Sequence, residues 1–341
     1  PLDIFTLFAL ILSLAMPTVI AVSSVELLKI LVGVALIGIY LALKKFKPKT
    51  IFWVSIIYFI NGGTVSFMNF PAFLFMTVYL PLALIVIHYF FEKKYWTVPV
   101  FAFVIVLYNF YLAYMILAFI SFAYLIEYFK QHKFNIKDFL LKGISFLALI
   151  FLGLLMSSVV LFPAITFIAE ETARQPVVFN PWILDLKFIK LELFPPEVYI
   201  RYVAKLFSPQ RPVSFRGFLG DYKVEHVSTY VSIIGLSLMA GVFFIKSKIA
   251  RVYKVVLAFV LIFTIFPVFS SILSGTFVMD LFSSDVSEPF PYNRWLNMVP
   301  VLQVLMIAYV IENLKMTRIN LLVITSMLLV IGIGVLSYYS K

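Results

Sequence analysis

The chain has 341 residues, of which 63% are hydrophobic and only 13% are charged. A soluble domain carries about 25% charged residues, so this composition excludes an ordinary soluble protein and predicts an all-α, polytopic transmembrane helical bundle. The net charge of +11 would indicate a nucleic-acid partner in a soluble protein. In a membrane protein it follows from basic cytoplasmic loops, so no nucleic-acid partner is predicted. The absence of cysteine excludes disulfides and thiolate metal sites.

Apolar runs long enough to cross about 30 Å of hydrocarbon recur along the whole chain. Gly, Pro and charged residues divide them into eight to ten predicted spans, in a single transmembrane domain covering residues 1–341. In chain order they are an entry stretch at 4–20 interrupted by Pro17, a first clear span at 23–43, a short helix at 51–61, a helix at 71–91 with a kink at Pro81, a hairpin of two short helices in 96–129 turning near Asn109, and spans at 143–162, 228–245, 255–274, 296–314 and 320–338.

The basic residues predict the orientation of these spans. Sixteen of the twenty-seven Lys and Arg residues lie in five short loops, at 44–49, 92–94, 130–142, 246–254 and 315–318. All five loops face the cytoplasm only if 51–91 and 96–129 each cross twice. The segment 163–227, with eight basic and seven acidic residues, then forms an extracytoplasmic loop inserted between helices.

This large loop contains one segment with a clear pattern. Residues 196–207, PEVYIRYVAKLF, have apolar side chains at helical spacing and predict an amphipathic helix lying on the membrane surface. No internal repeat of the kind found in many transporters is present.

Polar side chains within or beside apolar spans are costly, so they are the first candidates for function. Glu26 and Lys29 lie three residues apart on one helical face. They form either a self-neutralising pair with Lys29 reaching the interface, or a site in which Lys29 meets an anionic ligand. Asn109, Tyr111 and Tyr114 lie at the outer turn of the predicted hairpin. The two tyrosines belong either to an aromatic belt or to a surface on which a sugar ring stacks.

Two further candidates lie where helices meet the outer face. In LFPAITFIAEETAR a helix is expected to leave the membrane at Pro163 and to reach Glu170, Glu171 and Arg174, as a solvated loop or a site. In EPFPYNRWLN, at 288–297, the group Asn293, Arg294 and Trp295 is either an interfacial anchor or part of a binding site. Four more carboxylates lie in the outer segments, and their spacing selects none of them: Asp221, Asp280, Asp285 and Glu288.

No cofactor is predicted. The three histidines, His88, His132 and His226, are scattered without metal-ligand spacing. Nucleotide-binding and nucleophile-elbow motifs are absent from the sequence. The sequence does not decide whether a divalent metal assists, nor the oligomeric state.

Several segments, in order, resemble one family, the YfhO-type bacterial membrane proteins. They are PLDIFTLF (1–8), FMNFPAFLFMTVYLPLALIVIHYFFEKKYW (67–96), VLYNFYLAYMILAFISFAYLI (106–126), LFPAITFIAEETAR (161–174), VSTYVSIIGLSLMAGVFF (227–244) and EPFPYNRWLNMVPVLQ (288–303). The resemblance implies a GT-C-like glycosyltransferase that uses a polyprenyl-phosphate-linked sugar at the outer face of the cell membrane. Its acceptor would be a cell-envelope polymer such as teichoic or lipoteichoic acid.

The same resemblance implies where this chain departs from the family. GT-C enzymes usually carry the catalytic carboxylate in the first outer loop, and the chain is interpreted as a fragment that begins after that loop and also lacks the C-terminal part. Asp3 is a poor substitute by position, so the catalytic residue is unknown. Arg294, Arg174 and Lys29 are expected to face the leaving phosphate, where cations stabilise developing negative charge. The alternatives are a transporter or flippase of a lipid-linked envelope precursor, and a non-catalytic assembly partner.

Overall fold

In the computed structural model, the described residues are 4–61, 64, 71–131, 135–170, 193–194, 196–207, 218–219, 222–223, 229–274 and 294–339. Their regular structure is helical apart from one antiparallel pair of two-residue strands, β1 (Phe218–Leu219) and β2 (Tyr222–Lys223). The helices are α1 (Ile4–Ser13), α2 (Thr18–Leu43), α3 (Pro48–Phe59), α5 (Pro71–Phe91), α6 (Thr97–Tyr108), α7 (Phe110–Gln131), α8 (Ile136–Met156), α9 (Ser158–Glu170), α10 (Pro196–Phe207), α11 (Ile233–Ala240), η3 (Gly241–Phe244), α12 (Lys248–Ile265), α13 (Pro267–Ser274), η4 (Arg294–Met298), α15 (Val299–Asn313) and α16 (Met316–Tyr339).

Five helical segments of this bundle are long and apolar enough to cross a membrane. They are Thr18–Leu43, Leu74–Phe91, Leu112–Gln131, Ile136–Met156 and Trp295–Asn313. A sixth results if α12 and α13, which are bent by 104°, count as one span. These segments confirm the predicted α-helical bundle and indicate a multi-pass membrane protein. In the part of the chain that the structure describes, the expected eight to ten spans reduce to five or six of full length and three shorter apolar helices.

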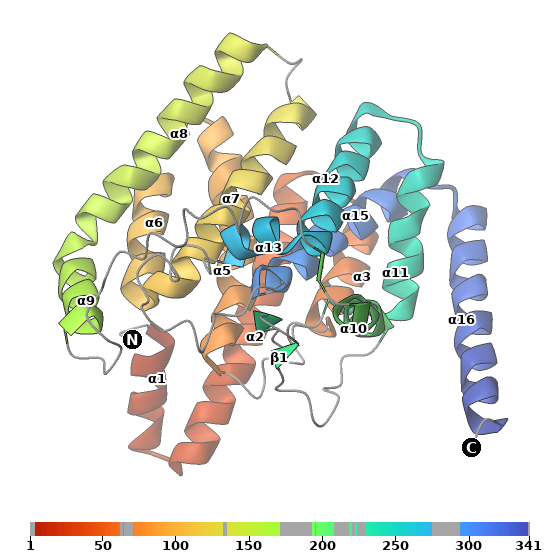
Figure 1. The fold of residues 1–341 in the computed structure, drawn as a ribbon, viewed down its shortest axis with the longest axis horizontal. Helices are drawn as coiled ribbons and strands as arrows, with labels where there is room; N and C mark the ends of the chain where they lie inside the picture. Colours follow the sequence, from red (N-terminus) through yellow and green to blue (C-terminus); the bar gives the residue numbers. More distant parts are fainter. Residues whose placement is uncertain are drawn as a thin grey trace.

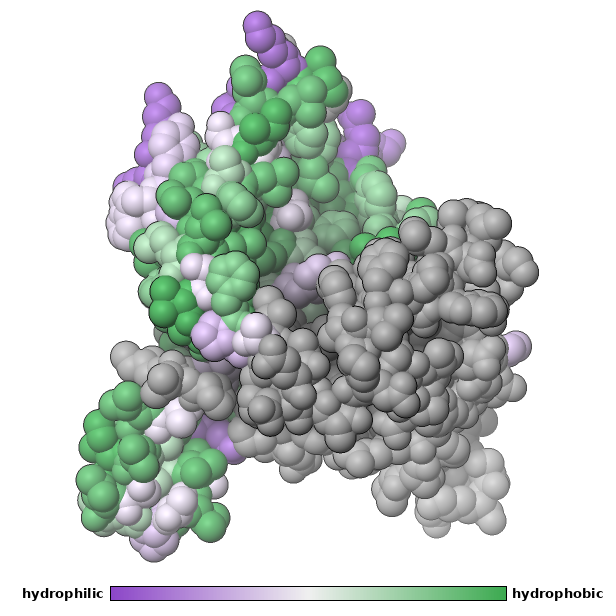
Figure 2. Space-filling view, turned by 60° about the vertical axis from the view of Figure 1, so that its left-hand side comes forward, coloured by the Kyte–Doolittle hydropathy of each residue, from purple (hydrophilic) through white to green (hydrophobic). Residues whose placement is uncertain are grey.

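The loops rich in lysine and arginine meet at one end of the bundle. Lys44 contacts His88, Lys47 pairs with Glu312, and Lys130 reaches α12. We call this the basic end and define it by the ends of α2, α5, α7 and α15 and the start of α12. Hydrophilic residues gather at one end of the face in Figure 2, above flanks of hydrophobic side chains. Residues 51–91 and 96–129 each contain two helices, as predicted. This arrangement returns the chain to the basic end after each pair of helices.

Two helix boundaries differ from the prediction, and both concern a proline. Residues 255–274 form two helices, because Pro267 has no N–H and holds Phe266 extended, with φ −101° and ψ 120°. Pro163 does not end a helix: it lies inside α9, and the chain instead breaks at Ser157, which caps α8. The expected exit from the membrane at Pro163 is therefore wrong as a helix boundary. The predicted loop at 163–227 begins within a helix.

The centre of the bundle is built from α5, α7 and α15. All residues of α15 from Val299 to Val310 are buried, as expected for a helix that is apolar on every side and surrounded by others. Figure 1 shows α8 and α16 at opposite edges of the molecule. Much of α8 is exposed apolar surface, which suits a helix facing lipid.

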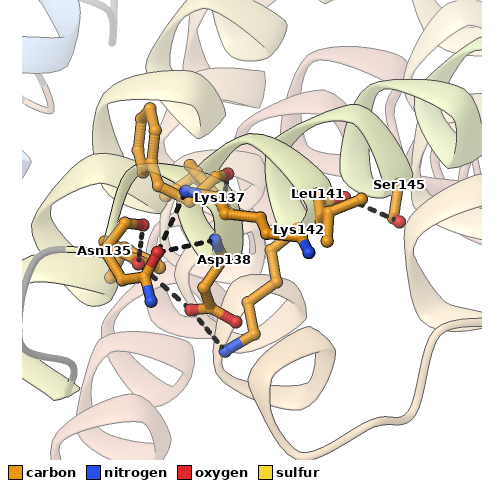
Figure 3. Close-up of polar contacts among 9 residues, drawn as sticks. Asn135, Lys137, Asp138, Leu141, Lys142 and Ser145 are labelled. Atoms are coloured by element: carbon orange, nitrogen blue, oxygen red, sulfur yellow. Dashed lines mark hydrogen bonds and ion pairs between the residues drawn. The ribbon is translucent and has the colours of Figure 1, made fainter.

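The start of α8 lies at the basic end and is held by polar contacts (Figure 3). Asn135 caps this helix, since its Oδ1 accepts from the backbone N–H groups of Lys137 and Asp138 at 3.0 and 3.4 Å. Asp138 then pairs with Lys142 at 3.0 Å and accepts from the Tyr128 hydroxyl at 3.0 Å. These contacts set the angle at which α8 leaves the bundle.

The predicted amphipathic helix at 196–207 is confirmed as α10. Val198 is buried beside Phe194, whereas Ile200 and Val203 are exposed. The Tyr199 hydroxyl donates to the Ile265 carbonyl at 2.7 Å, which places α10 beside the bend between α12 and α13. Its location on a membrane surface remains a prediction.

Candidate functional site

Trp295 of the NRWLN segment is a buried packing residue. Its side chain is 3% exposed, its Nε1 donates to Ser270 Oγ at 2.8 Å, and its backbone N–H donates to Ser274 Oγ at 3.2 Å. Trp295 thus bonds α13 through its ring and backbone N–H groups, and both the anchor and the binding-site interpretation of the segment remain predictions. Arg294 is the first residue of η4, and Asn293 lies outside the described residues.

The hairpin candidates make structural contacts. Asn109 lies in the extended break between α6 and α7, and its Oδ1 accepts from the Leu112 N–H at 3.2 Å. The Tyr114 hydroxyl donates to the Ile272 carbonyl at 2.5 Å, which joins α7 to α13. Tyr111 lies in α7, where the structure describes its backbone. The hydroxyl of Tyr114 therefore ties two helices together, and the stacking of a sugar on these tyrosines remains a prediction.

Lys29 is buried in the bundle. Its side chain is 6% exposed, and its Nζ lies 5.6 Å from the centre of the Phe5 ring and 6.0 Å from that of Tyr108. Lys29 precedes Lys44 by fifteen residues, which places it about 22 Å from the basic end at the rise of an α-helix. Glu26, one turn earlier, is half-buried. Lys29 is thus enclosed among aromatic rings far from the basic end, and it does not extend along the helix surface to reach water.

Most of the other predicted site residues lie outside the part of the chain that the structure describes. Arg174 and Glu171 lie outside the described residues, as do Asp221, Asp280, Asp285 and Glu288. Glu170 ends α9. A site shared by Arg294, Arg174 and Lys29 therefore stays a prediction.

Two buried amides of the central helix region were missed by the sequence reasoning. Asn297, the last residue of the NRWLN segment, is buried, and among the residues that the structure describes neither its Nδ2 nor its Oδ1 has a hydrogen-bond partner. The same holds for Gln303 Oε1. A buried polar group without a partner costs about 1–3 kcal/mol. Such a cost makes Asn297 a candidate for contact with a bound molecule.

Replacing Asn297 by leucine is expected to raise the free energy of unfolding by about 1–2 kcal/mol, because it removes an unsatisfied amide from an apolar site. Unfolding by SDS in mixed micelles measures the change. Asn313→Leu is the matched control, since Asn313 Nδ2 donates to the Tyr309 carbonyl at 2.9 Å and its loss brings no such gain. A drop in stability with Asn297→Leu would show that its amide has a structural partner.

A polar site of the described residues lies at the basic end. A cavity of about 440 Å³ opens between the ends of α2, α7 and α15 and the first turn of α12. Its lining includes the charged residues Lys44, Lys45, Glu127, Lys130 and Glu312, the tyrosines Tyr40, Tyr253 and Tyr309, the amides Gln131 and Asn313, and the apolar residues Leu43, Phe46, Ile249 and Leu305.

A buried ion pair forms one wall of this cavity. Lys44 Nζ bonds Glu127 Oε1, and the two side chains are 17% and 5% exposed. Lys44 also donates to His88 Nδ1 at 3.0 Å. An ammonium group has no acceptor, so the proton of the imidazole lies on Nε2, which is 3.1 Å from Glu92 Oε1. Burial lowers the pKa of Lys44, and the nearby Glu127 carboxylate opposes that shift.

A second chain of contacts also lines the cavity. Lys130 Nζ donates to the Tyr253 hydroxyl at 2.7 Å. The Tyr253 ring lies 5.4 Å from that of Tyr309, whose hydroxyl shares a 2.6 Å hydrogen bond with Ser247, the cap of α12. These contacts orient two phenol groups and one ammonium group toward one cavity.

Glu312 closes the third side. It pairs with Lys47 at 3.3 Å and accepts from the Thr50 hydroxyl at 2.7 Å. Within the described ranges, no three His, Asp or Glu side chains are grouped so as to hold a metal ion.

The sequence contained one signal for this site. Glu127 is an acidic residue within the apolar segment Leu112–Gln131, and such residues mark function or buried pairing. Lys44 and Lys130 were used only as markers of orientation. Their convergence on one cavity depends on the packing of α2, α7 and α12.

Comparison of the chain with protein-family models, with curated proteins and with solved structures finds no match in any of the three.

Proposed function

We propose that the chain is the membrane-embedded part of a GT-C-like glycosyltransferase. It would move a sugar from a polyprenyl-phosphate donor to a cell-envelope polymer, such as teichoic or lipoteichoic acid, at the outer face of the cell membrane. The proposal rests on the resemblance of the ordered segments to YfhO-type proteins, and on the multi-helix bundle. The basic end is then the cytoplasmic end.

The observation that supports this proposal most directly is the position of Lys29. Burying a lysine in a membrane bundle is costly, and this one lies beside Tyr108, next to the α6–α7 break and far from the basic end. A cation among aromatic rings at that depth suits a phosphate carried on an isoprenoid chain. Asn297, with its unpaired amide, adds a polar group in η4 of the NRWLN segment.

In the proposed reaction, Lys29, Arg294 and Arg174 stabilise the phosphate that leaves the sugar, since cations at developing negative charge lower the barrier. Asn293 and Trp295 hold the segment that carries Arg294, and Glu26 balances the charge of Lys29. Asn109, Tyr111 and Tyr114 form the edge of the sugar site. The carboxylate that takes the proton from the acceptor hydroxyl is not assigned to a residue of this chain.

One observation favours the alternative, a transporter or flippase of a lipid-linked precursor. Residues 248–274 form an apolar helix pair bent by 104° at Phe266. Interrupted helices of this kind often line the substrate path of transporters, because freed backbone groups coordinate what passes.

Complementation of a strain that lacks the gene tests both functions. The full-length protein is supplied as wild type, Lys29→Met, Arg294→Ala or the control Arg318→Ala, which changes a basic residue in the first turn of α16. Sugar on the envelope polymer is measured by mass spectrometry at matched expression. The control is expected to restore the modification, whereas Lys29→Met and Arg294→Ala fail to do so.

The side on which the donor accumulates separates the two functions. Loss of a transferase leaves the polyprenyl-phosphate sugar at the outer face, where membrane-impermeant periodate oxidises it. Loss of a flippase leaves it inside, protected from periodate. Full modification in both Lys29→Met and Arg294→Ala would contradict the phosphate roles.

A further inference from the structure

We infer that the cavity at the basic end binds the phosphate headgroup of an anionic phospholipid. The inference is independent of the proposed function, because this cavity lies about 22 Å from Lys29 along α2. If the lipid-binding inference fails, the proposed function is unaffected, and the reverse also holds.

The charges of the cavity leave an excess of cations. Glu127 is bonded to Lys44, and Glu312 is bonded to Lys47 and Thr50. Neither Lys45 nor Lys130, which also line the cavity, forms an ion pair with a carboxylate in the described part of the chain. Lys130 donates to the Tyr253 hydroxyl and also interacts electrostatically with Glu127. The three lysines and two glutamates of the lining therefore leave one net positive charge, and the exposed Lys45 is the lysine most open to an added anion.

The partial charges of the helix ends around the cavity do not cancel its net positive charge. The carboxyl-terminal ends of α2, α7 and α15 carry partial negative charge. Each has a lysine at or next to its last turn, namely Lys44, Lys130 and Lys315. Lys248 and Arg251, at the start of α12, add to the positive potential. A clustered positive potential attracts anionic groups to the cavity.

Hydrogen-bond donors for phosphate oxygens line the same space. The Tyr253 hydroxyl accepts from Lys130, which leaves its own proton to donate. The side-chain amides of Gln131 and Asn313 also line the wall, and each has a second N–H besides the one that it donates to Glu127 or to the Tyr309 carbonyl. Charge-assisted bonds from a lysine together with neutral donors suit a phosphodiester.

The apolar part of the lining favours a lipid over a free phosphate compound. Leu43, Phe46, Ile249 and Leu305 form part of the wall, so an acyl or glycerol portion has its own contacts. The cavity lies where three membrane-length segments end, at Leu43, Gln131 and Asn313. That is the depth of lipid headgroups, and basic pockets between helices at this depth are a recognised form of lipid site. Its volume of about 440 Å³ lies in the range of small-molecule sites.

Native mass spectrometry of the purified full chain in detergent tests this inference by titration with three probes. Phosphatidylglycerol is the anionic lipid, phosphatidylcholine is the lipid of zero net charge, and glycerophosphoglycerol is the headgroup without acyl chains. Phosphatidylglycerol is expected to bind about thirtyfold more tightly than phosphatidylcholine, from the roughly 1 kcal/mol contributed by each of Lys45 and Lys130 near a membrane surface. Glycerophosphoglycerol is expected to bind more weakly than the whole lipid.

Matched charge variants show whether the cavity is the site. Lys45→Gln and Lys130→Gln are each expected to weaken phosphatidylglycerol binding about fivefold. Lys49→Gln makes the same charge change in the first turn of α3, outside the cavity lining. It is expected to leave binding within about twofold, because the lost charge is exposed and screened. Lys130→Arg keeps the charge and is expected to retain binding. Lys45 is exposed, so Lys45→Gln is expected to leave the fold intact, and weaker binding by this variant reports on the site itself.

Three results would overturn the inference. Equal weakening by Lys49→Gln and Lys45→Gln would show general attraction to the basic end. Equal affinity for the two lipids would show that no anion is selected. Equal affinity for glycerophosphoglycerol and the whole lipid would assign the cavity to a soluble phosphate compound.

Discussion

Replacing Glu127 by leucine is expected to lower the free energy of unfolding by about 3–5 kcal/mol, the usual cost of breaking one partner from a buried ion pair. Glu127 accepts from both Lys44 and Gln131, and its side chain is only 5% exposed. The substitution leaves the ammonium of Lys44 in a partly desolvated wall with Lys130 nearby. SDS-induced unfolding in mixed micelles measures the loss.

The double variant Lys44→Met/Glu127→Leu supplies the control. Replacing both members of a buried pair by apolar side chains is often neutral, so the double variant is expected to recover most of the stability lost by the single one. Equal losses in the single and double variants would mean that the pair contributes through packing alone. A single variant as stable as the wild type would contradict the buried pairing itself.

Introducing a single methyl group at Gly33 is expected to destabilise the bundle by about 3 kcal/mol, at the upper end of the cost of overpacking a core. A Cβ at this position would lie 2.3 Å from the Thr77 carbonyl oxygen. This atom belongs to the backbone of α5 and also accepts from the Tyr58 hydroxyl at 2.8 Å. It cannot move without disturbing the packing of α2, α3 and α5 together.

Gly38→Ala, on the same helix, is the matched control. The nearest atom to a Cβ there is Ser55 Oγ at 3.5 Å, an ordinary contact. Alanine is favoured over glycine in a helix by about 1 kcal/mol, so Gly38→Ala is expected to be neutral or slightly stabilising. Equal effects of the two substitutions on SDS unfolding would contradict the close approach of α2 and α5.

The sequence determined the helices and their grouping because local rules were sufficient. Apolar runs bounded by basic residues predicted the long spans, and the amphipathic segment at 196–207 predicted α10. The break near Asn109 followed from a polar residue inside an apolar run. Proline was a less reliable guide, since Pro163 is accommodated within α9 while Pro267 divides a predicted span.

The chemistry of the candidate residues needed the tertiary structure. The NRWLN segment left Trp295 as either an interfacial anchor or part of a binding site, and the structure adds that its side chain is bonded to Ser270, twenty-five residues away in sequence. Asn297, two residues later, has an unpaired amide, and no local pattern distinguishes the two residues. Whether a buried polar group finds a partner depends on its neighbours in space.

The amino-acid sequence alone therefore determined a lipid-embedded helical bundle with its basic loops at one end, because burial in lipid constrains every residue of a span. Only the tertiary structure decided that Lys44 and Glu127, 83 residues apart, form a buried pair, and that Lys130 and Tyr253, 123 residues apart, line the same cavity. Distant residues meet through the packing of whole helices. Contacts such as that of Gly33 with Thr77 set this packing, and sequence spacing does not encode it.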